Sequence, residues 1–226
     1  RIGSSAASDV YKRQRIKRLV PALAFFVLVS GTLICLVNPY PGLSLFTGIT
    51  SLFGVSNFYL LSQSTDYFAE STQLNVFTHT WSLGVEEQFY FIFPLIIWFS
   101  GFIRKTKNGQ RNFILLLTFL ASISLATFVY LSQNNVSAAY FLMPARFWEM
   151  ASGSIFYFLS KSKRRYVNYF QNLNPNLNFL TILLIFLLPV SSNLIATILI
   201  VLLTNIFILN IREDFIIYKF LTHKYI

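Results

Sequence analysis

The sequence predicts an all-α protein, a polytopic bundle of about six transmembrane helices with one further segment that is re-entrant or interfacial. Of its 226 residues, 55% are hydrophobic and only 12% are charged, about half the charged share of a soluble domain. Uncharged apolar runs of about 20 residues recur along the chain, and the basic residues cluster between them. The net charge of +10 therefore indicates membrane topology, and we expect no nucleic-acid partner.

Residues 1–14 (RIGSSAASDVYKRQ) differ in composition from the rest of the chain. They are small and polar, show no hydrophobic periodicity and lack the apolar core of a signal peptide. We interpret them as an adapter or vector-derived scar, so that residues 15–226 form a partial membrane domain. The single cysteine, Cys35, lies in an apolar run and excludes a disulfide framework.

Each predicted span is an apolar run bounded by polar or helix-breaking residues. The first follows a basic cluster, tolerates Pro21 in its first turn and ends at the breaker Asn38–Gly42. The next run, Leu43–Leu61, is weaker because Gly48, Gly54 and several hydroxyl residues dilute it. The six spans predicted to cross are Leu19–Val37, Gln88–Ile103, Phe113–Leu131, Tyr140–Leu159, Leu177–Val190 and Asn193–Ile211.

The basic clusters orient these spans, because short cytoplasmic loops retain Lys and Arg. The clusters lie at residues 15–18, 104–111, 161–165 and 212–224, and helix pairs separate the last three from one another. All four can lie on the cytoplasmic side only if an even number of spans separates the first two. We therefore predict that Leu43–Leu61 does not cross, which puts the segment Thr78–Gln88 at the outer face.

The segment Thr78–Tyr90 (THTWSLGVEEQFY) contains the densest group of polar side chains in the chain, at the start of an apolar helix. On a helix Ser82 and Glu86 share a face, whereas Glu87 points about 100° away. Glu86 and Ser82 can therefore converge on one bound group. The alternative is an interfacial aromatic belt, with the acids reaching headgroup water.

A second candidate group is Arg146 and Glu149, inside the predicted span Tyr140–Leu159. Ionisable side chains in a membrane span are costly and indicate function. Arg146 would lie about 9 Å in from Tyr140, and it could pair with Glu149 at spacing i, i+3. A structural ion pair explains these residues as well as contact with a substrate does.

The third candidate group is Arg15 and Arg18, before the first span. Two guanidinium groups one turn apart could bind the phosphates of a nucleotide-containing donor, although a basic cluster also serves topology alone. The sequence contains no metal-ligand spacing, P-loop or nucleophile elbow, so we expect no metal.

At these three places the chain resembles the acyltransferase-3 family, bacterial integral-membrane enzymes that acylate surface glycans. The resembling segments are RIKRLVPAL (Arg15–Leu23), THTWSLGVEEQFYFIFP (Thr78–Pro94) and YFLMPARFWEMASGSI (Tyr140–Ile155). Asn57 and Asp66–Phe68 look like the branch in which an extracytoplasmic SGNH-type domain follows the membrane domain.

The resemblance implies a multi-pass enzyme of the bacterial inner membrane. It would transfer an acyl group, commonly acetyl, from acyl-CoA to a hydroxyl of a polysaccharide, lipopolysaccharide or peptidoglycan sugar. Arg15 and Arg18 would then bind the donor, and Glu86, His79, Ser82, Arg146 and Glu149 would form the catalytic site. The partners implied are the glycan acceptor and the lipid bilayer.

The chain also departs from the family pattern. Two helices before Arg15, the first with an Arg and a His, and two helices after Ile226 are expected but absent. The chain would therefore be an internal fragment of about six of about ten helices, inactive by itself. A transporter or flippase of lipid-linked glycans is the alternative, and the segment Thr78–Tyr90 argues against it.

Overall fold

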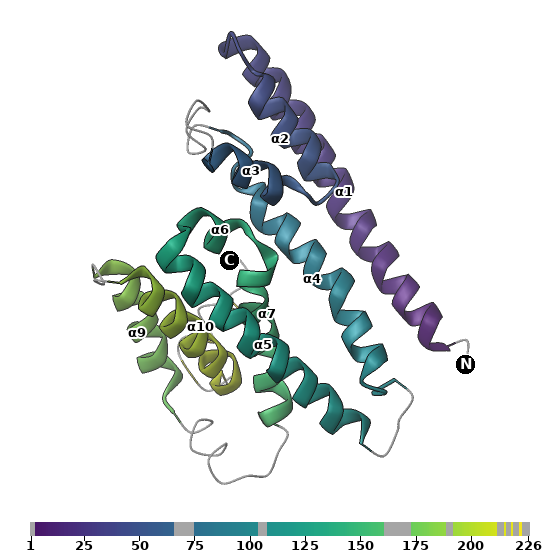
Figure 1. The fold of residues 1–226 in the computed structure, drawn as a ribbon, viewed down its shortest axis with the longest axis vertical. Coiled ribbons are helices and arrows are strands. Elements are labelled where there is room, and N and C mark those ends of the chain that lie inside the picture. Colours follow the sequence, from purple (N-terminus) through teal and green to yellow (C-terminus); the bar gives the residue numbers. More distant parts are fainter. Residues whose placement is uncertain are drawn as a thin grey trace. The chain divides into compact units, whose positions relative to one another are not determined.

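The computed structural model describes residues 3–65, 75–103, 108–160, 173–188 and 192–211, together with Phe215, Tyr218 and Thr222. Side chains in the first range are described from Lys17 to Ser64. All regular secondary structure in these residues is helical (Figure 1). The helices are α1 (Gly3–Val37), α2 (Gly42–Leu52), α3 (Ser56–Thr65), α4 (Thr80–Phe99), α5 (Gly109–Asn134), α6 (Val136–Phe141), α7 (Met143–Ser160), α9 (Pro175–Leu187) and α10 (Asn193–Asn210).

The all-helical membrane fold predicted from composition is confirmed. Within the described part of the chain, three helical stretches are long and apolar enough to cross a membrane: Lys17–Val37, Gly109–Asn134 and Asn193–Asn210. They coincide with three of the predicted spans. The helices α2 and α9 are apolar but shorter.

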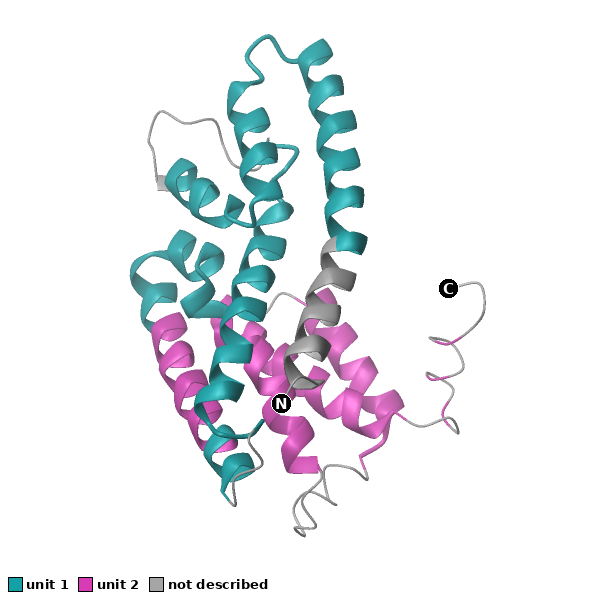
Figure 2. Ribbon diagram, turned by 90° about the vertical axis from the view of Figure 1, so that its right-hand side faces the viewer, with its two compact units in different colours: residues 1–113, 130–146 teal, residues 114–129, 147–226 magenta. Residues whose placement is uncertain are grey.

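The chain divides into two compact units (Figure 2). The first contains Arg1–Phe113 and Tyr130–Arg146, and the second contains Ile114–Val129 and Phe147–Ile226. The helices α5 and α7 each contribute to both units. The predicted boundary at residue 14 lies within α1, and its interpretation as a scar stays a prediction.

In the first unit, α2 packs against α1 through close glycine contacts. A Cβ atom on Gly31 would lie 3.2 Å from Leu45, and one on Gly48 would lie 3.1 Å from Val27. The helix α3 then contacts α2, α4 and α6. The fully buried side chains of Leu60 and Phe77 belong to the core of this unit.

The predicted re-entrant segment Leu43–Leu61 consists of two helices, α2 and α3, rather than one. The break contains Gly54, whose φ of 67° is a left-handed conformation that favours glycine. Helices of 11 and 10 residues are each about 15 Å long, against a hydrocarbon core of about 30 Å. Neither helix can cross alone, which favours the predicted topology, although the depth of the segment in a bilayer stays a prediction.

The prediction of one continuous helix over Tyr140–Leu159 is wrong. Helix α6 ends at Phe141, Leu142 is extended, and α7 begins at Met143. Pro144 explains the break, because it lacks an N–H group and its ring would clash with the carbonyl group four residues earlier. Arg146 therefore lies in the first turn of α7, so its depth cannot be counted along one continuous helix from Tyr140.

Two other predicted spans differ from the observed helices at their ends. The span Gln88–Ile103 is the second part of α4, which ends at Phe99, and Gly101 follows with a φ of 73°. The span Leu177–Val190 corresponds to α9, which has 13 residues, and Val190 lies outside the described residues. The side chain of Asn174 caps α9 by accepting a hydrogen bond from the backbone N–H of Asn176.

In the second unit, α9 packs against α10. The ring centroids of Phe179 and Phe207 lie 5.8 Å apart, and Asn178 donates to the carbonyl oxygen of Leu203. The helices α7 and α10 are joined by a buried hydrogen bond of 2.8 Å from Asn205 Nδ2 to Ser152 Oγ. Polar side chains thus link apolar helices, as is common where lipid surrounds a bundle.

Candidate active site

The start of α4 is held by hydrogen bonds from the preceding turn. Asn75 Oδ1 accepts from the backbone N–H of Phe77, and the hydroxyl of Thr80 donates to the carbonyl oxygen of Phe77. The amide nitrogen of Asn75 also donates to Thr47 Oγ1 at 2.7 Å and to Gln63 Oε1 at 3.3 Å. The turn that leads into the polar motif is therefore anchored on α2 and α3.

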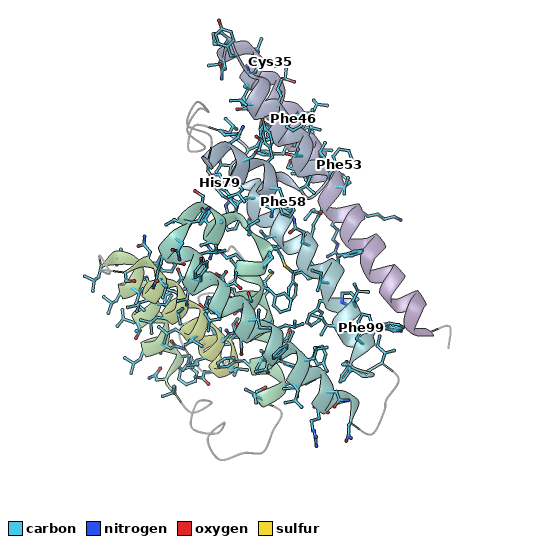
Figure 3. All side chains as sticks on the ribbon, in the orientation of Figure 1. Cys35, Phe46, Phe53, Phe58, His79 and Phe99 are labelled. Atoms are coloured by element: carbon cyan, nitrogen blue, oxygen red, sulfur yellow. The ribbon has the colours of Figure 1, made fainter. Side chains whose placement is uncertain are left out.

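The structure places Ser82, Glu86 and Tyr90 on α4 at the predicted spacing, and all three are exposed. Ser82 Oγ donates to the carbonyl oxygen of His79 at 3.3 Å. His79, labelled in Figure 3, is the N-cap residue of α4. Its side chain makes no hydrogen bond that caps the helix. The side chains of His79, Ser82 and Glu86 are thus accessible at one end of α4.

Trp81 and Arg146, from two sequence motifs 65 positions apart, meet in the first unit. The guanidinium carbon of Arg146 lies 5.6 Å from the ring centroid of Trp81 and 5.3 Å from that of Tyr140. The two rings are themselves 4.3 Å apart. Arg146 Nε also donates to the carbonyl oxygen of Tyr140 at 3.4 Å. Cation–π contacts of this kind hold a guanidinium group in place.

A second polar network joins α4 to the break between α2 and α3. Gln88 Nε2 donates to Asn57 Oδ1 at 2.9 Å and to the carbonyl oxygen of Gly54 at 3.3 Å. The fully buried Asn57 in turn donates to the carbonyl oxygen of Phe141 at 3.0 Å. Glu87 packs directly against Gly54, at the place that a Cβ atom would occupy.

An open pocket of about 500 Å³ lies beside this network, within the first unit. Its walls come from the break between α2 and α3, from α4 and from the start of α7. Phe53 and Phe58, which flank the break, contribute aromatic rings (Figure 3). Glu87 and Gln88 provide the polar side chains, whereas Glu86 is not part of the wall.

The other predicted site residues are not brought to this region by the described contacts. Arg18 is an exposed residue of α1, and the side chain of Arg15 lies outside the described residues. Glu149 belongs to the second unit, where its carbonyl oxygen accepts a hydrogen bond from Ser152 Oγ. The predicted ion pair between Arg146 and Glu149 stays a prediction.

Sequence reasoning gave no site role to Gln88 or to the pocket-lining position of Glu87, and it named Asn57 only as resembling one branch of the family. The prediction used the face of α4 that carries Ser82 and Glu86. It did not consider the neighbouring face, which carries Trp81 and Gln88. A usable signal was present, because Trp81 and Gln88 are seven residues apart and share a face with Gly84. A glycine on such a face indicates close approach of another segment, and a Cβ atom on Gly84 would lie 3.0 Å from the carbonyl oxygen of Gly54.

The described residues thus form a helical membrane protein. In its first unit, Arg146 contacts Trp81 in the first turn of α4, the helix that also carries Glu86 and Glu87. Among curated proteins, the chain is 33% identical over 148 residues to O-acetyltransferase OatA of Staphylococcus aureus strain NCTC 8325 / PS 47. It is 28% identical over 180 residues to "Putative O-acetyltransferase SACOL0978" of Staphylococcus aureus strain COL. These alignments cover 65% and 76% of this chain.

The chain spans about a quarter of the length of OatA, 24%, and 30% of SACOL0978. No family model matches the chain, and no solved structure matches it. The similarities thus relate this membrane protein to proteins named as O-acetyltransferases.

Proposed function

We propose that the chain is part of an acyltransferase-3 membrane enzyme that transfers an acyl group, most simply acetyl, from acyl-CoA to a sugar hydroxyl of a surface glycan. The observation that carries the proposal is the placement of Arg146 over the rings of Trp81 and Tyr140. Two motifs distant in sequence meet there, next to the helix turn that carries Ser82 and Glu86. The similarity to proteins named as O-acetyltransferases supports the same activity.

In the proposed reaction, Glu86 acts as the general base. Its carboxylate takes the proton of the acceptor hydroxyl as the hydroxyl oxygen attacks the acyl carbonyl carbon. An oxygen–carbon bond forms, the bond from that carbon to the donor sulfur breaks, and the sulfur leaves as a thiol with the proton that Glu86 took from the hydroxyl. The guanidinium group of Arg146, held in place by two rings, stabilises the negative charge that develops on the carbonyl oxygen. His79 and Ser82 border the same end of α4.

Arg15 and Arg18 are proposed to bind the phosphates of the donor at the cytoplasmic side, where the apolar stretch of α1 begins. They lie one helical turn apart, and Arg18 is exposed. A guanidinium group suits phosphate because it forms two parallel hydrogen bonds. With Glu86 at the outer side, the thioester end of the donor would have to reach through the bundle to Glu86, which requires a multi-pass protein, and we propose the bacterial inner membrane as its location. We also propose Glu149 as a residue of the catalytic site.

The proposal is tested by Glu86→Ala in a longer parent protein that contains this chain. We expect surface O-acetylation to fall about 100-fold or more, because a general base contributes at least that factor. O-acetyl groups released from isolated cell walls by mild base provide the measurement. Trp98→Phe, a change at the exposed far end of α4, is the control and should keep wild-type acetylation. Wild-type acetylation in Glu86→Ala, at equal membrane abundance, would contradict the assignment.

Arg146→Lys tests the second role. Lysine keeps the positive charge but lacks the planar group that stacks on Trp81 and Tyr140. We expect O-acetylation to fall about 10-fold or more, in line with the loss of one oriented stabilising group. Equal activity of the lysine variant would show that only a positive charge is needed, and that the stacked geometry is irrelevant to transfer.

A further inference from the structure

The pocket of about 500 Å³ lies where two breaks between helices meet α4. Gly54 and its neighbours contribute the break between α2 and α3, and Leu142–Pro144 contribute the break between α6 and α7. All of these residues belong to the first unit. The residues to which the reaction is assigned do not line the pocket, so its occupant is a separate question from the reaction.

The polar groups around the pocket have partners within the protein. At the first break, the carbonyl oxygen of Gly54 accepts from Gln88 Nε2. At the second break, the carbonyl oxygen of Phe141 accepts from Asn57 Nδ2, and Asn57 Oδ1 accepts from Gln88. Glu87 packs against Gly54 and has an interaction of its own. Unpaired backbone groups are excluded from the hydrocarbon region of a bilayer, so this pairing allows the pocket to face lipid.

The rest of the pocket wall is apolar and largely aromatic. Phe53, Phe58 and Phe91 line it, and their exposed fractions are 76%, 49% and 71%. An ordered water needs about two to four polar partners, whereas the two amide groups at the breaks already bond to each other and to the backbone. An empty hollow would leave the rings without contacts on one side. The wall therefore favours an apolar occupant.

The pocket is continuous with an exposed apolar stripe on α4. Phe91 in its wall is followed at positions i+4 and i+8 by Leu95 and Phe99, whose exposed fractions are 44% and 71%. Residues at this spacing share a helix face, and in a membrane protein such a face contacts hydrocarbon chains. In the predicted topology, Phe91 lies about 7–8 Å inward of Glu86 along α4, within the outer half of a hydrocarbon core of about 30 Å.

We propose that this pocket holds one acyl chain of a bilayer phospholipid, which enters from the exposed stripe of α4 and packs on the aromatic wall. The pocket volume lies within the range of about 300–1,000 Å³ that is typical of small-ligand sites, and an alkyl chain needs no hydrogen-bond partner. The acyl chain fills the space between the two helix breaks and supports the start of α7. It takes no part in the acyl transfer.

The test measures phospholipid that stays bound after the bilayer is removed. This chain is assembled in nanodiscs that contain phosphatidylethanolamine with a diazirine in its acyl chain, and is then transferred to dodecyl maltoside to remove loosely bound lipid. Native mass spectrometry should show one retained phospholipid. After photolysis, the labelled peptides should be those that contain Phe53–Phe58 and Phe91–Ile92. Loss of all lipid, or equal labelling of the exposed stretch Lys17–Val37, would overturn the proposal.

Ile92→Trp and Leu95→Trp form a matched pair of variants. Both residues are partly exposed aliphatic residues of α4, but only Ile92 lines the pocket. Ile92→Trp should reduce labelling of the pocket peptides about 10-fold, because the larger ring takes the space of the acyl chain and overfills the site. Leu95→Trp should leave labelling unchanged. Equal loss in both variants, or in neither, would contradict the proposal.

Phe91→Ala and Phe99→Ala are a second pair, which removes a ring instead of adding one. Phe91→Ala takes one ring from the wall and should reduce retention of the lipid several-fold, whereas Phe99→Ala, outside the pocket, should not. Circular dichroism and gel filtration check that each variant is folded. A result in which Phe91→Ala retains the lipid as wild type does would show that the aromatic wall does not hold the acyl chain.

Other occupants give different results. If a segment of a longer parent protein covers the pocket, the parent retains no probe there although this chain does, and the proposal falls. If water fills the pocket, neither protein retains the probe. Retention in both proteins, lost in Ile92→Trp and kept in Leu95→Trp, supports the lipid site whether or not acyl transfer depends on Glu86.

Discussion

At the scale of single residues, Gly54 controls the geometry around the pocket. Its φ of 67° turns the chain between α2 and α3, and its missing side chain leaves room for the carboxylate of Glu87. Its carbonyl oxygen also accepts from Gln88. One residue without a Cβ atom thus sets the direction of α3 and the position of a carboxylate on α4.

Gly54→Ala should therefore destabilise the protein by about 1–3 kcal/mol, because alanine is strained at this φ and its methyl group meets Glu87. Gly42→Ala is the control, since a Cβ atom there would have no neighbour within 4 Å. The measurement is unfolding in mixed micelles with increasing SDS, followed by tryptophan fluorescence. Equal stability of the two variants would contradict the role given to Gly54.

At the scale of the helices, polar side chains decide how apolar surfaces pair in the second unit. Asn205, in the middle of the apolar helix α10, donates to Ser152 Oγ on α7 and to its own helix at the carbonyl oxygen of Val201. Ser124 of α5 accepts from the backbone N–H of Trp148, whose ring lies 5.8 Å from that of Phe128. In lipid, apolar contact alone discriminates poorly between helix faces, so these bonds select the packing.

Asn205→Ala should weaken the second unit by about 0.5–1.7 kcal/mol, the range measured for hydrogen bonds between membrane helices. Ser152→Ala should have a similar effect, and the double variant should lose less than the sum, because both changes remove one shared bond. Thr197→Ala, on an exposed face of α10 where the hydroxyl bonds only within its own helix, should stay within about 0.5 kcal/mol of wild type. Strict additivity of the two changes would argue against the bond. Unfolding in SDS, followed by circular dichroism, gives these values.

At the scale of the whole molecule, the main prediction is topological. Basic clusters set the cytoplasmic side, and α2 and α3 are each too short to cross alone. If the pair does not cross, the turn after α1 faces outward and the turn before α5 faces the cytoplasm. If it does cross, the turn before α5 faces outward.

Asn38→Cys and Asn108→Cys, each in a Cys35→Ser background, test this topology. Both residues lie in turns between helices. We expect Asn38→Cys to react with a membrane-impermeant maleimide in intact spheroplasts, and Asn108→Cys to react only after permeabilisation. Reaction of both positions in intact spheroplasts would mean that α2 and α3 together cross the membrane, and would reverse the orientation of α5 and α10.

Much of this architecture could be predicted from the sequence, but two features of the candidate site could not. The apolar runs predict α1, α5 and α10 well, since each has an uncharged apolar stretch long enough to span. The break at Leu142 was locally signalled by Pro144, yet the apolar run across it hid the signal. The pairing of Trp81 with Arg146, and the choice of Glu87 over Glu86 for the pocket, depend on contacts between segments distant in sequence.

The sequence by itself determined that the protein is helical, that it belongs in a membrane and which short segments hold its polar residues. These properties depend on side chains that are neighbours in the sequence. The free energy of transferring an apolar run from water into lipid is a sum over its residues, and it hardly depends on which helix lies beside the run. Only the tertiary structure decided which face of α4 meets α3 and α6, and hence which of two adjacent carboxylates lines a pocket. That choice follows from helix rotation and close approach at Gly54 and Gly84, where van der Waals contact and paired hydrogen bonds allow one arrangement.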